Sequence, residues 1–208
     1  MALDSLPPIV PAFELSGANQ GMSKGVLQSD GAQFIPRASL KLRKVQVGGQ
    51  WKNISTNSAK GEASIFGGWA GKVSTLDVGG LIAYKMLTSA SGSGNRQSWE
   101  VSANAARRFG RLGIRASAVF SPNDFGGTRR SLYVEAGPSL DLPWKFRASA
   151  SVGIRERRNN SDYTSFNLGL SRPLGKKFTV DVRYYDTNRG DLGETFDNRL
   201  VGSIKLSL

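Results

Sequence analysis

The stretch KFTVDVRYYDTNRGDLGETFDNRLVGSIKLSL, residues 177–208, decides the fold class because apolar and polar residues alternate in it with a period of two. The alternation begins at Phe178, pauses in a polar loop, and then resumes and continues to the last residue, Leu208. Successive side chains of a β-strand point to opposite faces. The stretch therefore predicts two antiparallel strands, each with one apolar and one polar face.

The same alternation recurs along the whole chain, and no helical periodicity of useful length interrupts it. Long polar loops, such as residues 89–96 and 188–197, alternate along the chain with tight connections, such as residues 43–44. Long loops at one end and short turns at the other are typical of outer-membrane barrels. The pattern predicts an all-β fold, an antiparallel up-and-down transmembrane β-barrel with both termini on the periplasmic side. Its twelve strands are expected at about 13–24, 32–42, 45–54, 62–73, 77–88, 97–108, 111–121, 130–141, 145–156, 163–172, 177–187 and 198–208.

The first residues differ from the rest of the chain because they contain three prolines, which cannot donate to a β-ladder. We expect residues 1–12 to form an extended periplasmic tail, with a plug folded back into the barrel as the alternative. Residues 13–208 then form a single barrel domain.

The two faces of the predicted strands have different compositions. One face holds mainly Ala, Val and Gly and almost no charge in mid-strand. A twelve-stranded interior is too wide for such small residues to fill as a dry core. We therefore expect the apolar face to contact lipid and the charged face to line an aqueous lumen. The predicted lumen and selectivity residues are Arg37, Lys41, Lys52, Lys72, Lys85, Arg115, Arg147, Arg155, Arg183, Lys205, Glu100, Glu135 and Asp181.

Aromatic residues gather near the predicted strand ends. Tyr and Trp prefer membrane interfaces because their rings are apolar and carry one polar group. The predicted membrane-interface residues are Trp51, Trp69, Tyr84, Trp99, Trp144 and Tyr184. The alternative is the ordinary preference of aromatic residues for β-strands.

Composition excludes several classes of enzyme. The chain has no histidine and no cysteine, which excludes Ser-His-Asp hydrolases, thiol chemistry and histidine-ligated metal sites. We predict no enzymatic activity, no cofactor and no metal. No apolar run approaches the length of about 20 residues that a membrane helix needs. A secretory signal is also absent from the given sequence, so we expect a mature outer-membrane chain of bacterial origin.

Several segments resemble one bacterial barrel family. GVLQSDGA, FSPNDFGGT followed by SLYVEAGPSLDLP, DYTSFNLGLSRPL and VRYYDTN occur in the order typical of the Gcw_chp or TorF-type porins. The likeness extends from about Phe13 to Leu208 and implies an outer-membrane porin fold. It supplies no catalytic residues.

The charge balance leaves three functions to compare. The 28 Lys and Arg against 16 Asp and Glu favour a small passive pore with a net-basic lumen that attracts anionic solutes. Alternatively, cross-strand ion pairs close the lumen, and the barrel is an anchor or a partner subunit in an envelope complex. A nucleic-acid binder would place aromatic and basic residues on one face, whereas here they lie on opposite faces. The predicted partners are therefore outer-membrane lipid and small solutes, with an envelope protein as the alternative and the oligomeric state left open.

Overall fold

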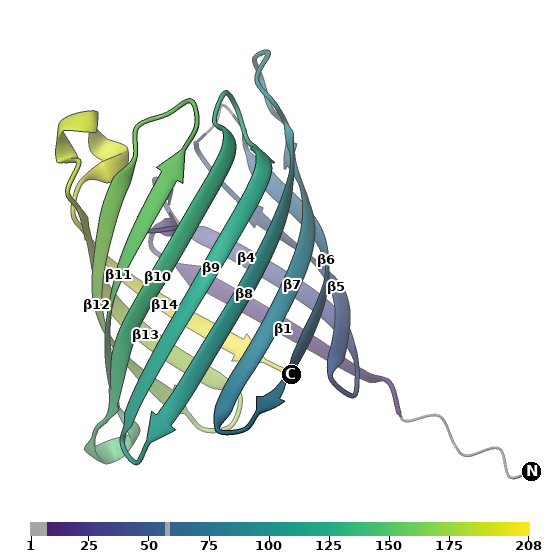
Figure 1. Ribbon diagram of the computed structural model, residues 1–208, viewed down its shortest axis with the longest axis vertical. Helices are drawn as coiled ribbons and strands as arrows, with labels where there is room; N and C mark the ends of the chain where they lie inside the picture. The colour runs from purple at the N-terminus through teal and green to yellow at the C-terminus, as the bar shows by residue number, and fades with distance from the viewer. Residues whose placement is uncertain (1–7, 57–58) are drawn as a thin grey trace, which may run out of the picture.

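The computed structural model describes residues 8–56 and 59–208, which form a closed twelve-stranded antiparallel β-barrel (Figure 1). Consecutive strands pair around the barrel, and the first strand closes it by pairing with both β4 and β14. The barrel strands are β1 (Val10–Ala18), β4 (Gln33–Leu42), β5 (Val45–Asn53), β6 (Gly61–Val73), β7 (Leu76–Thr88), β8 (Gln97–Phe109), β9 (Leu112–Asp124), β10 (Arg129–Asp141), β11 (Arg147–Arg157), β12 (Tyr163–Leu174), β13 (Phe178–Thr187) and β14 (Arg199–Ser207). The predicted fold class and strand number are confirmed.

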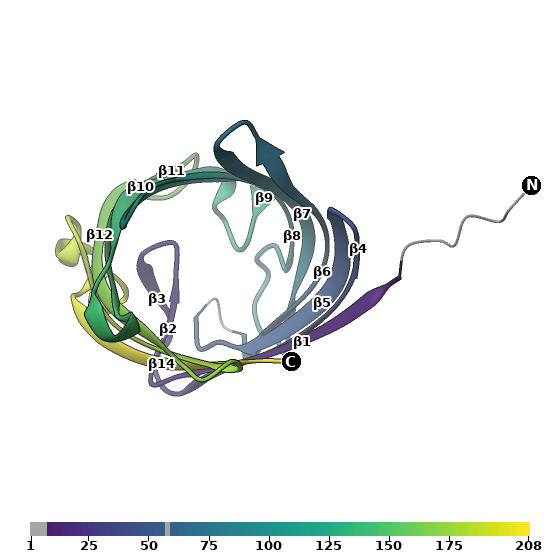
Figure 2. The ribbon, with the colours of Figure 1, turned by 90° about the horizontal axis from the view of Figure 1, so that it is seen from below.

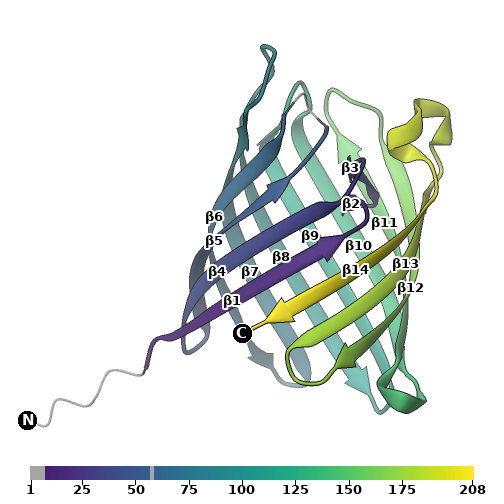
Figure 3. The same ribbon diagram turned by 180° about the vertical axis from the view of Figure 1, so that it is seen from behind.

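Strand β1 is the element whose bounds differ most from the prediction. It begins at Val10 and ends at Ala18 instead of covering residues 13–24. Its register with β14 starts only at Glu14, next to paired backbone hydrogen bonds of 3.1 and 2.9 Å between Phe13 and Leu208. Pro11 therefore pairs with β4 alone, and its missing donor is tolerated at this open edge (Figure 3). The rest of the predicted tail, apart from Pro8 and Ile9, lies outside the described residues.

Loop length separates the two ends of the barrel, as the sequence predicts. The turns at 43–44, 74–75, 110–111 and 175–177 lie at the end where β14 finishes, and the longer connections lie at the other end (Figure 1). One turn contains the short helix η1 (Pro143–Lys145), and the last long loop contains η2 (Gly190–Leu192) and η3 (Glu194–Phe196). These ends are called the short-turn end and the long-loop end below.

The exposed face of the barrel is apolar and the enclosed face is polar. Ile65, Leu168 and Leu200 are each more than 60% exposed on the outside. The most deeply buried side chains are instead Glu62, Ser98, Ser121 and Ser165. This is the reverse of a soluble barrel and places the hydrophobic face where hydrocarbon can cover it. In the described part of the chain, no helix is long and apolar enough to cross a membrane.

A second, two-stranded sheet lies inside the barrel. It consists of β2 (Gly21–Ser23) and β3 (Val26–Ser29), which form an antiparallel hairpin between β1 and β4. Figure 2 shows this hairpin within the ring of strands. The sequence predicts a strand end and a polar loop here, so this element is a correction to the prediction.

Candidate solute pathway in the lumen

The turn of the β2–β3 hairpin has a conformation that suits glycine better than lysine. Lys24 and Gly25 connect the two strands, and their φ angles are +52° and +82°. Two positive φ values identify a type I′ turn, in which Asn or Gly is preferred at the first position. A lysine there has a less favourable backbone conformation than glycine, and the tip also contacts the barrel wall.

Two contacts position the backbone of the tip against β12. The hydroxyl of Tyr163 donates a hydrogen bond of 2.7 Å to the carbonyl oxygen of Lys24. Gly25 lies so near Ser165 that a Cβ atom added to this glycine would be 2.2 Å from the Ser165 Cβ. The hairpin therefore crosses the lumen from β1 and reaches the wall at β12.

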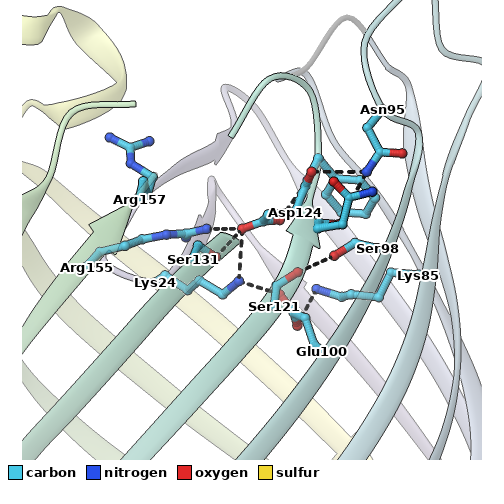
Figure 4. Close-up of polar contacts among 12 residues, drawn as sticks. Lys24, Lys85, Asn95, Ser98, Glu100, Ser121, Asp124, Ser131, Arg155 and Arg157 are labelled. Carbon is cyan, nitrogen blue, oxygen red and sulfur yellow. Dashed lines mark hydrogen bonds and ion pairs between the residues drawn. The ribbon is translucent and has the colours of Figure 1, made fainter. Parts of the chain in front are cut away.

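The ammonium of Lys24 binds two carboxylates of the wall (Figure 4). It donates to Oε1 of Glu100 on β8, and its Nζ lies 4.0 Å from Oδ2 of Asp124 at the end of β9. Burial and the neighbouring Arg155 guanidinium lower the pKa of Lys24, while Glu100 and Asp124 act in the opposite direction. The charge at the tip is thus largely removed from water and depends on the wall for compensation.

This contact is part of a line of alternating charges across the barrel wall. Glu62 lies 3.2 Å from both Lys52 and Lys85, and Lys85 lies 2.9 Å from Glu100. Asp124 in turn pairs with Arg155 of β11 and accepts a 2.7 Å hydrogen bond from Ser131. We call this line the charge ladder; in order, its members are Lys52, Glu62, Lys85, Glu100, Lys24, Asp124 and Arg155.

The base of the hairpin is also bonded to the wall, through Gln28 of β3. Its amide nitrogen donates to Glu62 at 3.2 Å, and its side-chain oxygen accepts from Lys52 at 2.7 Å. Its backbone carbonyl accepts from the Ser55 backbone N–H at 3.0 Å and from the Thr56 hydroxyl at 3.2 Å. One glutamine therefore connects the hairpin to the ladder and to the loop after β5.

The hairpin separates the cavities of the lumen. On the long-loop side is a cavity of about 490 Å³, the vestibule, whose walls include Lys24, Glu100 and Arg155. On the other side are cavities of about 160 and 190 Å³, which both contact Met22 and Tyr185. Lys24 lines the vestibule and the 160 Å³ cavity, so the hairpin tip is the partition between them.

A second polar cluster lies at mid-height, below the tip. Arg115 pairs with Glu135 at 3.1 Å, and Glu135 also accepts a 2.9 Å hydrogen bond from the hydroxyl of Tyr133. Arg183 pairs with Asp181, two residues away on the same strand, at 3.0 Å. These groups line or border the cavity of about 160 Å³.

The short-turn end has exposed ion pairs. Arg147 lies 2.7 Å from Asp141, which also binds Arg108 at 3.1 Å. Lys72 lies 3.5 Å from Asp77. Nearer the middle of the wall, Arg37 and Lys205 lie 3.8 and 4.0 Å from Glu14. Lys41, close to the short-turn end, has no carboxylate within 4.0 Å in the described part of the chain.

The strand register places every predicted lumen residue on the inner side of the barrel. Their role in selectivity stays a prediction. Sequence analysis did not assign Lys24 or Asp124 to the lumen face. The sequence carries no clear signal for the hairpin, because its strands are very short and Lys-Gly is not one of the usual two-residue hairpin pairs.

The predicted interface aromatics fall near the two ends of the barrel. Tyr84 and Trp99 are cross-strand neighbours with ring centroids 5.0 Å apart, and Trp51 and Tyr184 also lie toward the long-loop end. Trp69 lies toward the short-turn end, and Trp144 is 81% exposed within the turn before β11. Their contact with a membrane interface stays a prediction.

A family model described as a bacterial protein of unknown function (Gcw_chp) matches residues 46–205. The chain belongs to this family. No curated protein sequence matches it.

Solved structures of outer-membrane porins share the fold of this Gcw_chp chain. A KdgM porin in complex with disordered oligogalacturonate is 11% identical with a TM-score of 0.63, and 95% of this chain and 99% of that chain are covered. The NanC porin is 9% identical with a TM-score of 0.61 over 94% and 97% of the two chains. The COG4313 outer membrane channel from Pseudomonas putida F1 is 9% identical with a TM-score of 0.59 over 99% and 97%. These neighbours are porins and channels rather than enzymes, and at such low identity the likeness establishes the fold alone.

Proposed function

We propose that this Gcw_chp protein is a passive channel of the bacterial outer membrane that admits small solutes and favours anions. The observation that carries the proposal is the inversion of the barrel: aliphatic residues cover the outside, while charged and hydroxyl side chains line cavities inside. A polar lumen of this kind is typical of porins, in which lipid covers the apolar band.

The proposed preference for anions rests on the lining of the lumen. Basic residues outnumber acidic ones on the inner wall in the register of the strands, although most of them lie near a carboxylate. A residual positive field in a narrow passage attracts anions and repels cations. Since a KdgM porin was solved with oligogalacturonate, short carboxylated sugars are a reasonable class of solute to test on this chain.

Conductance across planar lipid bilayers tests the channel. The refolded protein should show small unitary currents, and in a KCl gradient the reversal potential should have the sign of anion preference. Cation preference would disprove the anion part of the proposal. If neither the intact protein nor a variant without the hairpin Gly21–Ser29 conducts, the protein is not a channel.

One observation favours a second candidate, a closed barrel that anchors or assembles with an envelope protein. The hairpin and the charge ladder together fill the lumen between the vestibule and the cavities below it. This candidate predicts a stable partner that co-purifies in detergent, together with no conductance from either form of the chain.

A further inference from the structure

We propose that the β2–β3 hairpin is a movable gate of the lumen and that Lys24 is the latch that holds it closed. The proposal rests on the proposed channel function and adds the mechanism by which the channel opens. It comes from the position of the hairpin between two cavities and from the way the wall residues are paired.

The position of the hairpin explains why its movement would open a path. Lys24 contacts both the vestibule of about 490 Å³ and the cavity of about 160 Å³. Moving the tip away from Ser165 therefore joins the two cavities. Asn19 supplies a fixed point for this movement, because its backbone and side chain make hydrogen bonds of 3.1 and 2.9 Å with Gly202 of β14.

The two wall carboxylates that Lys24 binds do not need it to be paired. When Lys24 leaves, Glu100 keeps Lys85 at 2.9 Å, and Asp124 keeps Arg155 and the Ser131 hydroxyl. An opening that left a carboxylate buried and unpaired would be strongly unfavourable. Here each carboxylate that Lys24 binds has another cation, so opening avoids this penalty.

The hairpin is also weakly stabilised on its own. An isolated two-stranded hairpin is only marginally stable in water, and Lys24 has a positive φ angle that L-residues avoid. The desolvation of the Lys24 ammonium, which lowers its pKa, offsets part of its attraction to the two carboxylates. The backbone strain and the desolvation therefore oppose the docked position, which the bonds of Tyr163 and Gln28 favour.

Two single substitutions test the gate by independent means. Lys24→Glu places a carboxylate beside Glu100 and Asp124, so charge repulsion should drive the tip from the wall. Gly25→Ala adds a Cβ atom 2.2 Å from the Ser165 Cβ, so steric overlap should do the same without a change of charge.

Both substitutions have matched controls in the turn at 175–177, which lies outside the lumen. Lys176→Glu makes the same change of charge at an exposed position. Gly175→Ala introduces a comparable backbone strain, because the φ of Gly175 is +70°, but its added Cβ meets nothing within 4 Å. Deletion of Gly21–Ser29 with a short Gly-Ser connection is the reference for a permanently open lumen.

Single-channel recording of all five variants and the intact protein decides the question, after heat-modifiable gel mobility has shown that each barrel is folded. We expect Lys24→Glu to raise the ratio of open to closed time about tenfold, equivalent to about 1.4 kcal/mol. Gly25→Ala should act in the same direction, the deletion should stay open, and both controls should behave as the intact protein does. If the intact and hairpin-deleted proteins conduct with equal amplitude and open time, the gate is disproved while the channel stands. If no form of the protein conducts, including the deletion variant, the channel function itself is disproved.

Discussion

The two ends of the inner wall carry the same kinds of residue but hold them in different surroundings. At the long-loop end, the side chain of Glu62 is 1% exposed, and those of Lys85 and Glu100 are 12% and 11% exposed. At the short-turn end, the side chains of Lys72 and Asp77 are 76% and 58% exposed. The difference arises because the hairpin and its neighbouring loops cover the first group, whereas the second lies at the mouth of the barrel.

The contribution of an ion pair on the barrel wall to stability therefore depends on whether the pair is buried or exposed. Exposed pairs typically contribute about 0–1 kcal/mol. Removal of one partner from a buried pair costs about 3–5 kcal/mol, because it leaves an uncompensated charge. The long-loop end should therefore determine stability and closure, while the short-turn end should affect mainly the local electric field.

The largest expected effect is on the free energy of unfolding. Glu62→Gln leaves the ammonium groups of Lys52 and Lys85 without the carboxylate that both contact at 3.2 Å, so we expect a loss of about 3 kcal/mol. Asp77→Asn removes the partner of one exposed lysine and should cost less than about 1 kcal/mol. Urea titration in lipid vesicles, read out by the folded and unfolded bands on gels, measures both values.

The pair Glu62→Gln and Asp77→Asn removes the same charge, so net charge cannot explain a difference between them. Lys85 keeps Glu100 at 2.9 Å in the first variant, which limits the loss to the lower part of the range. Equal costs at the two positions would contradict the comparison of the two ends.

Local alternation was sufficient to predict the fold and the orientation of its faces. In each barrel strand, apolar and polar residues alternate, so the strand's own sequence separates its lipid-facing side from its lumen-facing side. Lipid contact needs no packing against distant parts of the chain. The hairpin could not be inferred in this way. Its strands, Gly21–Ser23 and Val26–Ser29, are too short for a clear period, and its docking depends on residues such as Tyr163, far away in the sequence.

The sequence predicts which charged residues face the lumen, but it does not predict which of them pair with one another. The alternation assigns Lys52, Lys85 and Glu100 to the inside, yet it does not specify which strands lie opposite the hairpin. Asp124 was placed in a loop because the predicted strand ended at residue 121, whereas β9 continues to Asp124 itself. The contact between Lys24 and these carboxylates is a property of the closed barrel, which brings together residues from separate hairpins.

A smaller effect is expected on ion selectivity, at the short-turn mouth. Lys41→Gln removes an exposed cation that has no carboxylate within 4.0 Å in the described residues. The reversal potential in a KCl gradient should shift toward cations by a few millivolts, and the shift should shrink as salt screens the charge. Stability and open time should not change.

Lys176→Gln is the matched control for Lys41→Gln, because it removes the same charge from a turn at the same end. Lys85→Gln is the contrasting change at the long-loop end, where Lys85 contacts Glu62 and Glu100. It should reduce stability in addition to any effect on selectivity. If Lys41→Gln shifts the selectivity no more than Lys176→Gln does, then Lys41 does not contribute to the electric field that selects ions at the short-turn mouth.

The smallest expected effect concerns the aromatic residues at the two ends. In single-tryptophan variants that retain Trp51, Trp69, Trp99 or Trp144, lipids brominated near the headgroup should quench fluorescence more than lipids brominated at the chain ends. Indole rings favour the interface, where the apolar ring and the N–H group are both accommodated. Trp144, which is 81% exposed within a turn, should be quenched at the shallowest depth, whereas Trp69 lies within β6 and should be somewhat deeper. If lipids brominated at the chain ends quench either residue more strongly, the short-turn end does not lie at an interface. Its ion pairs would then not be exposed to water, and removing one of them should cost more stability than predicted here.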